Sequence, residues 1–373
     1  MKADPESRKT VLVVGAGGNI GSHLVPHLAR MAEVGRAVLV DKDRYEESNM
    51  ASQDIDRRDL GKSKAQVAAR RIRSIAPDKE VVAIADDVRN VPLGRLRADV
   101  VVACLDSREA RRVVNTIAWR LGMPYVDTGV RGEDLLLARV NVYLPGKGNG
   151  CLECAWDEKD YDRATLEQPH PCTKAGPAPT NAPSALGALA GALGAIECQK
   201  LLSGRAEAAA VGRQVLVDAL HHNHYVTVYP PNPDCRFDHA TWRNVERLAR
   251  DPGSITLAEA FALRERKVRG NGSPALAVEG QAFVRQVQCL GCGGVKPCLR
   301  LQGRLRRSER VCARCGGELA AAGSGLAWSL KAEELRERML QWPLCRAGFR
   351  RGDVFTLSGG GRCARFEIDC GGV

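Results

Sequence analysis

The alternation of apolar and polar positions in the first half of the chain predicts strands separated by helices. A short apolar run at residues 11–14 leads into a glycine-rich turn, a helical pattern and then a second apolar run at residues 37–40. The pattern continues with strands at residues 80–84, 99–104 and 124–128 and with helices at residues 63–74 and 108–121. Such alternation predicts an α/β fold, with a mostly parallel sheet covered by helices on both faces.

The pattern changes after about residue 136. Residues 137–143 alternate as an antiparallel strand does, and residues 214–220 and 225–229 predict an antiparallel pair. A helix predicted at residues 184–202 carries small side chains on one face, namely Gly187, Gly191, Gly194 and Ala195. Small side chains allow two backbones to approach closely. We interpret this face as a helix–helix contact at a dimer seam.

We place a first domain at residues 1–239, with residues 1–10 as a disordered tail, and a second domain at residues 240–373. The second domain is predicted to contain an amphipathic helix near residues 331–340 and a closing hairpin at residues 353–369. It also contains two CxxC pairs, each followed by glycine, formed by Cys289, Cys292, Cys312 and Cys315. Two such knuckles, about twenty residues apart, are typical of a zinc ribbon. We place the ribbon at residues 287–318 of a small α+β domain.

Composition and net charge limit the number of domains and the kinds of binding partner that the chain can have. The chain has 373 residues, of which 44% are apolar, enough for two domains with buried cores. Its net charge of +11 suits nucleic acid, an acidic protein or an arginine-rich solvated surface. For the segment LRLQGRLRRSER between the CxxC pairs we favour protein docking over nucleic acid.

The N-terminal residues lack an apolar segment, and we find no run of about 20 apolar residues, so we expect a cytoplasmic protein without a membrane span. In that compartment the fourteen cysteines favour metal ligands or catalytic thiols over disulfides.

The glycine turn GAGGNIG is the first candidate site. Gly15, Gly17 and Gly18 have no Cβ, so their backbone N–H groups can come close to a phosphate. The N-terminus of the following helix adds a partial positive charge. Asp41 ends the second apolar run, where a carboxylate can hold two ribose hydroxyls. This unit predicts nucleotide binding by a Rossmann-like fold, and it suits NAD as well as ATP.

Polar groups farther along the chain favour ATP. Asn49 follows Asp41 closely, Lys64 begins a predicted helix, and Asp106 follows the apolar run at residues 99–104. The carboxyl ends of parallel strands border one crevice, so we expect these side chains to converge there. Lys64 can neutralise a triphosphate, and Asp106 can bind Mg²⁺, which takes hard oxygen ligands. Hydride transfer needs neither group.

Several stretches, taken in order, resemble the ubiquitin-activating superfamily: GAGGNIG, VDKD, SNMASQD, GKSKA, CLDSREARRVVN, GCLEC, CTKAG and LGAIECQKLL. They are most similar to bacterial adenylyltransferases that activate sulfur-carrier proteins, and the likeness covers about residues 11–239. It implies that the C-terminal carboxylate of a ubiquitin-like protein attacks the α-phosphate of ATP, giving an acyl adenylate and pyrophosphate. On matching positions Asp41 would bind ribose, Asn49 and Lys64 phosphates, and Asp106 Mg²⁺. Asp43 and Gln53 lie in the same nucleotide-binding stretches.

The resemblance also implies a reactive cysteine. It places a nucleophilic or persulfide-forming thiol in a loop with a pattern similar to CTKAG, which makes Cys172 the candidate. Lys174 nearby would favour the thiolate form. The alternative is an ordinary loop thiol. Cys104 and Cys198 fall inside a predicted strand and a predicted helix, where we expect them to pack in the core.

A further zinc site follows from the same resemblance. Relatives combine a first CxxC, here Cys151 and Cys154, with a second CxxC after the last strands. Here that place reads CRFDH, with Asp238 where a cysteine is expected. We assign Cys235 and His239 as the remaining ligands of a closed, structural Cys3His site. Together with the ribbon, this predicts two zinc ions per chain.

The sequence departs from the family pattern where relatives bind the triphosphate. Its glycine turn is one residue longer, and Ser52 stands where relatives carry an arginine before Gln53. The start MKADPESRKT has no counterpart of the N-terminal helix whose arginine reaches the partner subunit's site. Arg8, Arg57 and Arg58 are the candidate replacements.

We therefore expect an ATP- and Mg²⁺-dependent adenylyltransferase that acts, as a homodimer, on a ubiquitin-like or sulfur-carrier protein with a C-terminal glycine. The second domain would recruit the carrier or a conjugating-enzyme-like partner. Two other interpretations stay open. One is an NAD-dependent oxidoreductase, in which Lys64, Asp106 and the CxxC motifs would have no role. The other is a catalytically inactive zinc-ribbon adaptor on the same nucleotide-binding fold.

Overall fold

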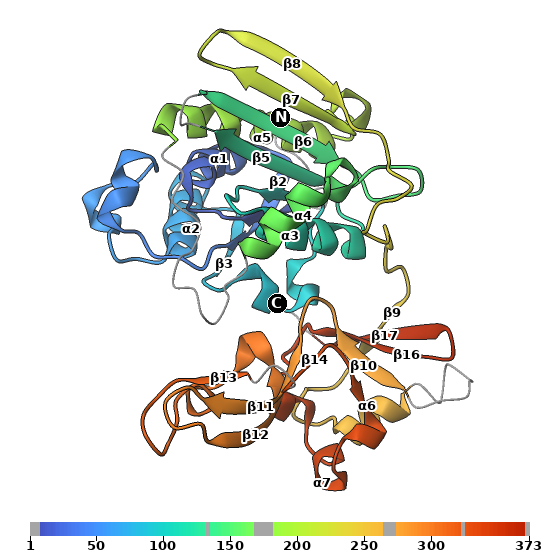
Figure 1. The fold of residues 1–373 in the computed structure, drawn as a ribbon. Coiled ribbons are helices and arrows are strands. Elements are labelled where there is room, and N and C mark those ends of the chain that lie inside the picture. Colours follow the sequence, from blue (N-terminus) through green and yellow to red (C-terminus); the bar gives the residue numbers. More distant parts are fainter. Residues whose placement is uncertain (1–7, 132–134, 168–181, 264–273, 322–324, 370–373) are drawn as a thin grey trace. The chain divides into compact units, whose positions relative to one another are not determined.

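The computed structural model describes residues 8–131, 135–167, 182–263, 274–321 and 325–369. Cys172 and Lys174 lie outside these residues. The chain forms two compact units, drawn in Figure 1. Unit 1 consists of Met1–Val88 and Leu96–Trp242, and unit 2 of Arg89–Arg95 and Arg243–Val373. A short segment from the first half of the chain therefore belongs to unit 2.

Unit 1 is built on an eight-stranded sheet. Its strands, in spatial order, are β3 (Glu80–Ile84), β2 (Val34–Val40), β1 (Lys9–Val14), β4 (Val100–Ala103), β5 (Tyr125–Arg131), β6 (Leu137–Tyr143), β7 (Arg213–Asp218) and β8 (Asn223–Val228). The first five strands are parallel, and β5 to β8 pair antiparallel. Lys9 and Thr10, which we predicted to be part of a disordered tail, begin β1.

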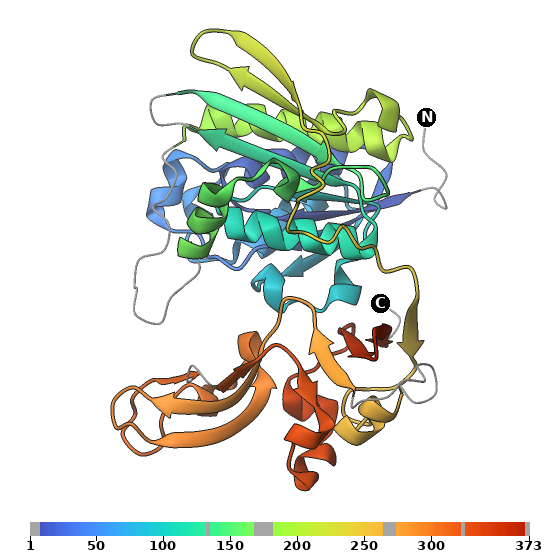
Figure 2. The same ribbon diagram turned by 45° about the vertical axis from the view of Figure 1, so that its right-hand side comes forward.

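Helices cover both faces of the parallel strands (Figures 1 and 2). Val11 and Val13 of β1 join one core with α1 (Asn19–Arg30), α2 (Lys64–Ile75) and α5 (Ser184–Leu202). The side chains between them point the other way, because successive residues of a strand alternate. On that face lies α3 (Arg108–Leu121), with α4 (Glu158–Leu166) beside it. The predicted mostly parallel α/β sheet with helices on both faces is confirmed.

The face of α5 that carries small side chains packs against other elements of the same chain. A Cβ on Gly191 would lie 3.1 Å from the backbone of α1 at Ile20 O and Leu24 N, and one on Gly194 would lie 2.6 Å from Thr128 of β5. The predicted helix–helix contact exists, but it is made with α1, so this face does not form a dimer seam. By length and composition alone α5 could also cross a membrane, although half of that apolar stretch is buried, as in the core helix of a folded domain.

Unit 2 contains two smaller sheets. The larger has the order β15 (Leu330–Lys331), β10 (Ala275–Val278), β16 (Val354–Gly359), β17 (Arg362–Ile368) and β9 (Val245–Leu248). The other consists of β11 (Phe283–Cys289), β12 (Val295–Leu301) and β13 (Leu319–Ala321), with β14 (Leu326–Ala327) also on β11. Within its described residues, this α+β unit also contains two short helices, α6 (Leu257–Ala262) and α7 (Glu337–Leu340).

The predicted hairpin at residues 353–369 is confirmed by the antiparallel pair β16–β17. The predicted helix at residues 331–340 is wrong. Leu330 pairs with Leu276 of β10, a 3-10 turn follows, and α7 keeps only four residues. Strand pairing in the fold outweighs the local helical pattern, as tertiary context often does.

A buried ion pair holds part of unit 2 together. The side chains of Arg304 and Asp353 are each 2% exposed. Arg304 also donates to the carbonyl oxygens of Gly348 at 3.1 Å and of Asn90 at 3.0 Å. The second of these bonds explains why Arg89–Arg95 clusters with unit 2.

Removal of the Asp353 carboxylate would leave the Arg304 guanidinium buried without its counter-ion. We expect Asp353→Ala to lower the free energy of unfolding of unit 2 by about 3–5 kcal/mol. The control is Asp251→Ala, which breaks the exposed 2.8 Å ion pair with Arg351 and should change stability far less. Chemical unfolding of the full chain measures both variants, and equal losses would contradict the prediction.

Candidate nucleotide site and cysteine clusters

The glycine turn joins β1 to α1 and is tied to the end of β2. The N–H of Gly17 donates to Asp41 Oδ2 at 2.9 Å, and the N–H of Asp43 donates to Asp41 Oδ1 at 3.1 Å. Burial raises the pKa of Asp41, although these two N–H groups and Lys64 oppose that shift. The Gly17 N–H thus already has a carboxylate acceptor. Gly18 precedes α1 without a side-chain cap, so no capping side chain occupies the N-terminus of α1 beside the glycine turn.

Lys64 begins α2, as predicted, and lies against the glycine turn. A Cβ on Gly17 would be 2.4 Å from Lys64 Cβ, so only glycine permits this approach. Lys64 is 7% exposed, and its Nζ lies 4.0 Å from Asp43 Oδ2 and 5.6 Å from the centre of the Tyr45 ring. The structure therefore brings together Gly17, Asp41, Asp43 and Lys64.

The loop that carries Asn49 and Gln53 follows β2 and forms the 3-10 turn η2 (Glu47–Ala51). Asn49 Oδ1 accepts from the backbone N–H of Glu46 at 3.0 Å, so this amide caps its own turn. Gln53 Oε1 is buried and has no hydrogen-bond partner. An unpaired buried carbonyl oxygen is costly in a folded protein and is common where a ligand completes the site. The amide of Gln53 is thus a stronger ligand candidate than that of Asn49.

Asp106 follows β4 at the carboxyl edge of the sheet and is exposed. Gly15, with a φ of +80°, packs against Cys104 and Leu105, the two residues before Asp106. This contact places the β4 loop beside the glycine turn. Cys104 itself is buried, and burial raises the pKa of its thiol to about 12, which fits the predicted core role. Cys198 is buried in α5 as well.

The N-terminus of α3, next to Asp106, is held by Glu167. One carboxylate oxygen of Glu167 accepts from Ser107 Oγ at 2.8 Å and from the Glu109 N–H at 3.1 Å. The partial positive charge of this helix end is therefore neutralised by a side chain of the same chain. Sequence reasoning missed both Glu167 and α4, although Asp157 and Asp160 carry the capping pattern of a helix start.

The three candidate arginines lie in different places. Arg8 precedes β1 and pairs with Asp78 at 2.9 Å. The six residues of β1 place it about 20 Å from the glycine turn, so it cannot serve the nucleotide site of its own chain. Arg57 and Arg58 begin the 3-10 turn η3 (Arg57–Asp59) and are exposed. Arg58 pairs with Asp56 and lowers the pKa of that carboxyl to about 2, whereas Arg57 has only a longer, exposed ion pair with Glu47 at 3.7 Å and is the more available of the two.

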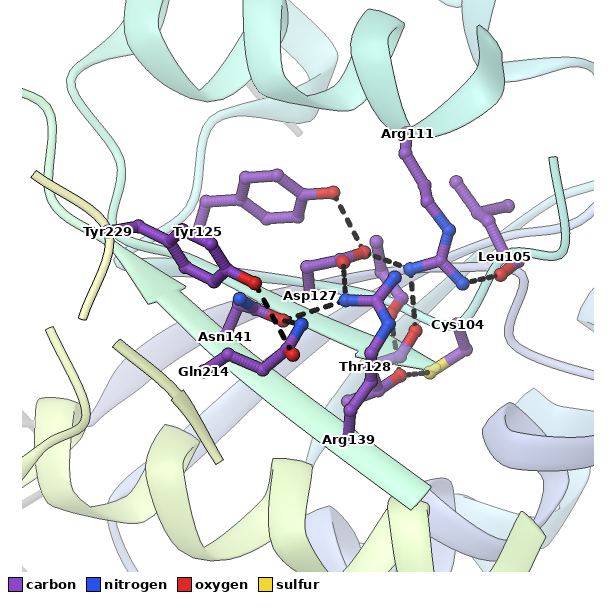
Figure 3. Close-up of polar contacts among 11 residues, drawn as sticks. Cys104, Leu105, Arg111, Tyr125, Asp127, Thr128, Arg139, Asn141, Gln214 and Tyr229 are labelled. Carbon is purple, nitrogen blue, oxygen red and sulfur yellow. Dashed lines mark hydrogen bonds and ion pairs between the residues drawn. The ribbon is translucent and has the colours of Figure 1, made fainter. Parts of the chain in front are cut away.

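A buried polar cluster connects α3 with β5 and β6 (Figure 3). Asp127 of β5 is fully buried and accepts hydrogen bonds from Arg111, Arg139 and Tyr125. Burial alone would raise the pKa of Asp127, but Arg111 and Arg139 outweigh it and hold the pKa below its usual value. The sequence does show charged residues, Asp127 and Arg139, within two otherwise apolar strands. It does not show that these two residues contact each other.

The structure brings Cys151, Cys154, Cys235 and His239 together, with their ligand atoms within 4.8 Å of one another. The Cys151 sulfur is 3.8 Å from that of Cys235 and 3.9 Å from that of Cys154. A tetrahedral zinc ion with Zn–S bonds of about 2.3 Å separates its sulfurs by about 3.8 Å. Burial lowers the pKa of His239, which favours the neutral imidazole that a metal ligand requires.

The local backbone explains why His239 rather than Asp238 joins this cluster. His239 has a φ of +52°, and its Nε2 lies 3.2 Å from the Cys154 sulfur. Asp238 instead forms a forked ion pair with Arg120, at 2.6 and 3.1 Å. The Arg120 guanidinium in turn lies over the rings of Phe237 and Trp242.

The second cluster consists of Cys289, Cys292, Cys312 and Cys315 in unit 2. Its two knuckles have the same hydrogen bonds: the N–H groups of Gly293 and Gly316 donate to the carbonyls of Cys289 and Cys312. Both glycines have a φ near +70°, which explains the glycine after each CxxC. The sulfur of Cys292 is 3.8 Å from that of Cys312, and the sulfur of Cys289 is 3.4 Å from that of Cys315. The Cys292 N–H lowers the pKa of Cys289 to about 6. Either cluster could hold zinc.

Comparison with known proteins identifies the family of the chain and agrees with this fold. The model of the ThiF family matches residues 6–237. Ubiquitin-like modifier-activating enzyme 5 of Oryza sativa subsp. japonica is 27% identical over 270 residues, 67% of this chain and 61% of that protein. The SAMP-activating enzyme E1 of Haloferax volcanii is 31% identical over 228 residues, 60% of this chain and 78% of that protein.

Among solved structures, E. coli MccB with succinimide has a TM-score of 0.52 and 23% identity, covering 62% of this chain and 67% of that one, a likeness of fold alone. The chain is a member of the superfamily of enzymes that activate ubiquitin-like proteins. Within that superfamily it belongs to the ThiF family. It spans about three-fifths of the length of the ubiquitin-like modifier-activating enzymes it matches.

The contact between Gly17 and Lys64 can be tested without a ligand. In Gly17→Ala the new Cβ would lie 2.4 Å from Lys64 Cβ and 2.7 Å from the Tyr45 hydroxyl, so we expect the free energy of unfolding to fall by about 1–3 kcal/mol. Gly18→Ala is the control, because its Cβ would meet Gly15 O at an ordinary 3.5 Å. Urea unfolding compares the two variants, and an equal effect would refute the contact.

Proposed function

We propose that this protein is an ATP-dependent adenylyltransferase that activates the C-terminal carboxylate of a ubiquitin-like or sulfur-carrier protein ending in glycine. The observation that carries the proposal is the junction of Gly17, Asp41 and Lys64 beside the uncapped N-terminus of α1. Family membership and relatives named as activating enzymes of ubiquitin-like proteins support it.

In the proposed reaction, a carboxylate oxygen of the carrier bonds to the α-phosphorus of ATP. The bond between that phosphorus and the bridging oxygen breaks, and pyrophosphate leaves with the electron pair. Lys64 stands beside the glycine turn, where its charge can offset that of the phosphates. Asp106 is an exposed carboxylate of the kind that holds Mg²⁺, and this ion, when bound, would neutralise charge on the phosphate oxygens.

The same proposal includes later steps and partners. The Cys172 thiolate would attack the acyl adenylate to form a thioester, and AMP would leave; alternatively, that cysteine would carry a persulfide whose outer sulfur comes from a sulfane-sulfur donor. Unit 2 would dock the carrier or a conjugating-enzyme-like partner, through a ribbon on which Lys296, Arg306, Arg307, Arg310 and Arg314 are exposed. We further propose a homodimer located in the cytoplasm.

We also propose that both cysteine clusters bind zinc in closed, structural sites. Each offers four ligands, and the sulfur separations of 3.8–3.9 Å in the first cluster fit a tetrahedral ion. Zinc would stabilise the ribbon, whose local core is small.

One observation favours the second candidate, an inactive adaptor. Ser52 stands where the family carries an arginine. Arg8 lies at the end of β1 opposite the glycine turn, and Arg58 is paired with Asp56. Lys64 and Arg57 would then have to supply the charge alone, so the adaptor is the outcome we expect if the first experiment below fails.

The first experiment is pyrophosphate–ATP exchange with carriers that end in Gly-Gly. We expect exchange by the full chain and a loss of about 100-fold or more in Asp106→Ala, because the metal carboxylate is removed. Asp78→Ala is the control, since Asp78 pairs with Arg8 before β3 and lies away from the carboxyl edge. Undiminished exchange in Asp106→Ala would remove the metal assignment. No exchange by the wild type with any carrier would favour the adaptor.

The second experiment measures zinc by mass spectrometry of the purified full chain. We expect two zinc ions per chain, one for each four-ligand group. His239→Ala should retain one, because three ligands hold the ion less tightly, and Asp238→Ala should retain two. Equal zinc content in the two variants would refute the Cys3His assignment.

A further inference from the structure

We propose that Arg111 is a positioning residue that fixes the main chain carrying Asp106, through a buried cluster that also includes Asp127 and Arg139. The inference rests on the proposed function, because it concerns the metal-binding carboxylate. Figure 3 shows the cluster: Arg111 reaches down from α3, and Arg139 approaches Asp127 from β6.

The Arg111 guanidinium connects the loop after β4 to the neighbouring strand β5. Its Nη2 donates to the carbonyl of Leu105, the residue directly before Asp106. Its Nη1 donates to the carbonyl of Thr128 at 2.7 Å and to Asp127. Leu105 follows β4, while Asp127 and Thr128 belong to β5, so one planar group sets the position of the β4 loop relative to the neighbouring strand.

Three further contacts hold Asp127 and its neighbour Arg139 in place, and Asp127 in turn holds the Arg111 guanidinium. Asp127 is fully buried, and its second carboxylate oxygen accepts from Arg139 at 2.8 Å. Tyr125 donates to the first oxygen at 3.1 Å. Arg139 is itself held by Asn141 Oδ1 at 2.7 Å. Since the Arg111 side chain is only 9% exposed, it has little freedom to adopt another rotamer.

Arginine chemistry is required at position 111. The guanidinium offers five donors in a rigid plane and here serves three acceptors, one in the loop after β4 and two in β5. A lysine ammonium keeps the charge but is a single point donor on a flexible stem, so it cannot hold all three acceptors at once. Arg111→Lys therefore removes the positioning while it preserves the charge.

Loss of the Arg111 contacts is expected to weaken Mg²⁺ binding by Asp106 rather than direct contacts with the nucleotide. A carboxylate that is held in place binds an ion better than one on a loose loop, and loss of such supporting contacts weakens metal affinity about 10–100-fold. We expect Arg111→Lys to raise the Mg²⁺ concentration needed for half-maximal ATP binding by about tenfold. Saturating Mg²⁺ should restore ATP binding, because Asp106 itself is still present.

The test measures binding of a non-hydrolysable ATP analogue to the purified full chain by calorimetry across a Mg²⁺ series. Arg112→Lys is the matched control, since Arg112 is the next residue on α3 but pairs with Glu109 at 2.8 and 2.9 Å. This control should shift the Mg²⁺ midpoint less than threefold.

A merely structural role for Arg111 would lower the bound fraction at every Mg²⁺ concentration without moving the midpoint, and that result would overturn the proposal. An unchanged midpoint and binding in Arg111→Lys would overturn it as well. If Arg111→Lys does not fold, Asp127→Asn replaces it, because it loosens Arg111 at almost constant volume and should move the midpoint in the same direction. A wild-type chain that binds no ATP would instead refute the proposed function, which separates the two failures.

Discussion

The close approach of three backbone segments at the glycine turn determines the shape of the candidate site. A Cβ on Gly15 would lie 2.4 Å from the carbonyl oxygen of Cys104, and one on Gly17 would lie 2.4 Å from Lys64 Cβ. Cys104 follows β4 and Lys64 begins α2, so these contacts bring the β4 loop and the start of α2 against the turn. Asp41 completes the junction by accepting the Gly17 N–H. Gly17, Asp41 and Lys64 lie together because glycine allows close approach to the main chain of the turn, not because long side chains reach across a gap.

Next to this junction, the charged side chains around Asp127 are buried at a place in the sheet where apolar side chains could pack instead. Replacement of a buried ion cluster by apolar side chains is often neutral or stabilising. The cluster around Asp127 therefore needs a reason beyond stability. An apolar group could fill the space between β4 and β5, but it could not donate to the carbonyls of Leu105 and Thr128. Leu105 directly precedes Asp106 in the loop after β4, and Thr128 lies in β5, so the buried charge is tied to the position of that loop.

The parts of the fold that sequence predicts well are those with strong local signals. Apolar runs between helical patterns predict the parallel strands, and the bounds of α3 and α5 agree with the expected helices. The parts that it misses depend on partners far away in the chain. Leu330 pairs with β10 instead of starting a helix, and Arg89–Arg95 joins unit 2 through contacts such as that of Asn90 with Arg304. Likewise, Asp127 and Arg139 look like isolated charges in apolar strands until β5 and β6 pair.

The two departures from the family pattern have different structural outcomes. At the first cysteine cluster, Asp238 occupies the expected cysteine position, but Arg120 takes up its carboxylate and the left-handed backbone of His239 brings an imidazole to the sulfurs. The ligand set is therefore completed one residue later in the chain. At the expected triphosphate site, Ser52 stands in place of the family's arginine. Arg8 cannot replace that arginine, because it lies before the first residue of β1, at the end of the strand away from the glycine turn. Of the candidate cations in the part of the chain that the structure describes, Lys64 and Arg57 can still supply charge to the phosphates. The metal cluster is thus the better preserved of the two features, and the phosphate contacts decide whether the crevice is catalytic.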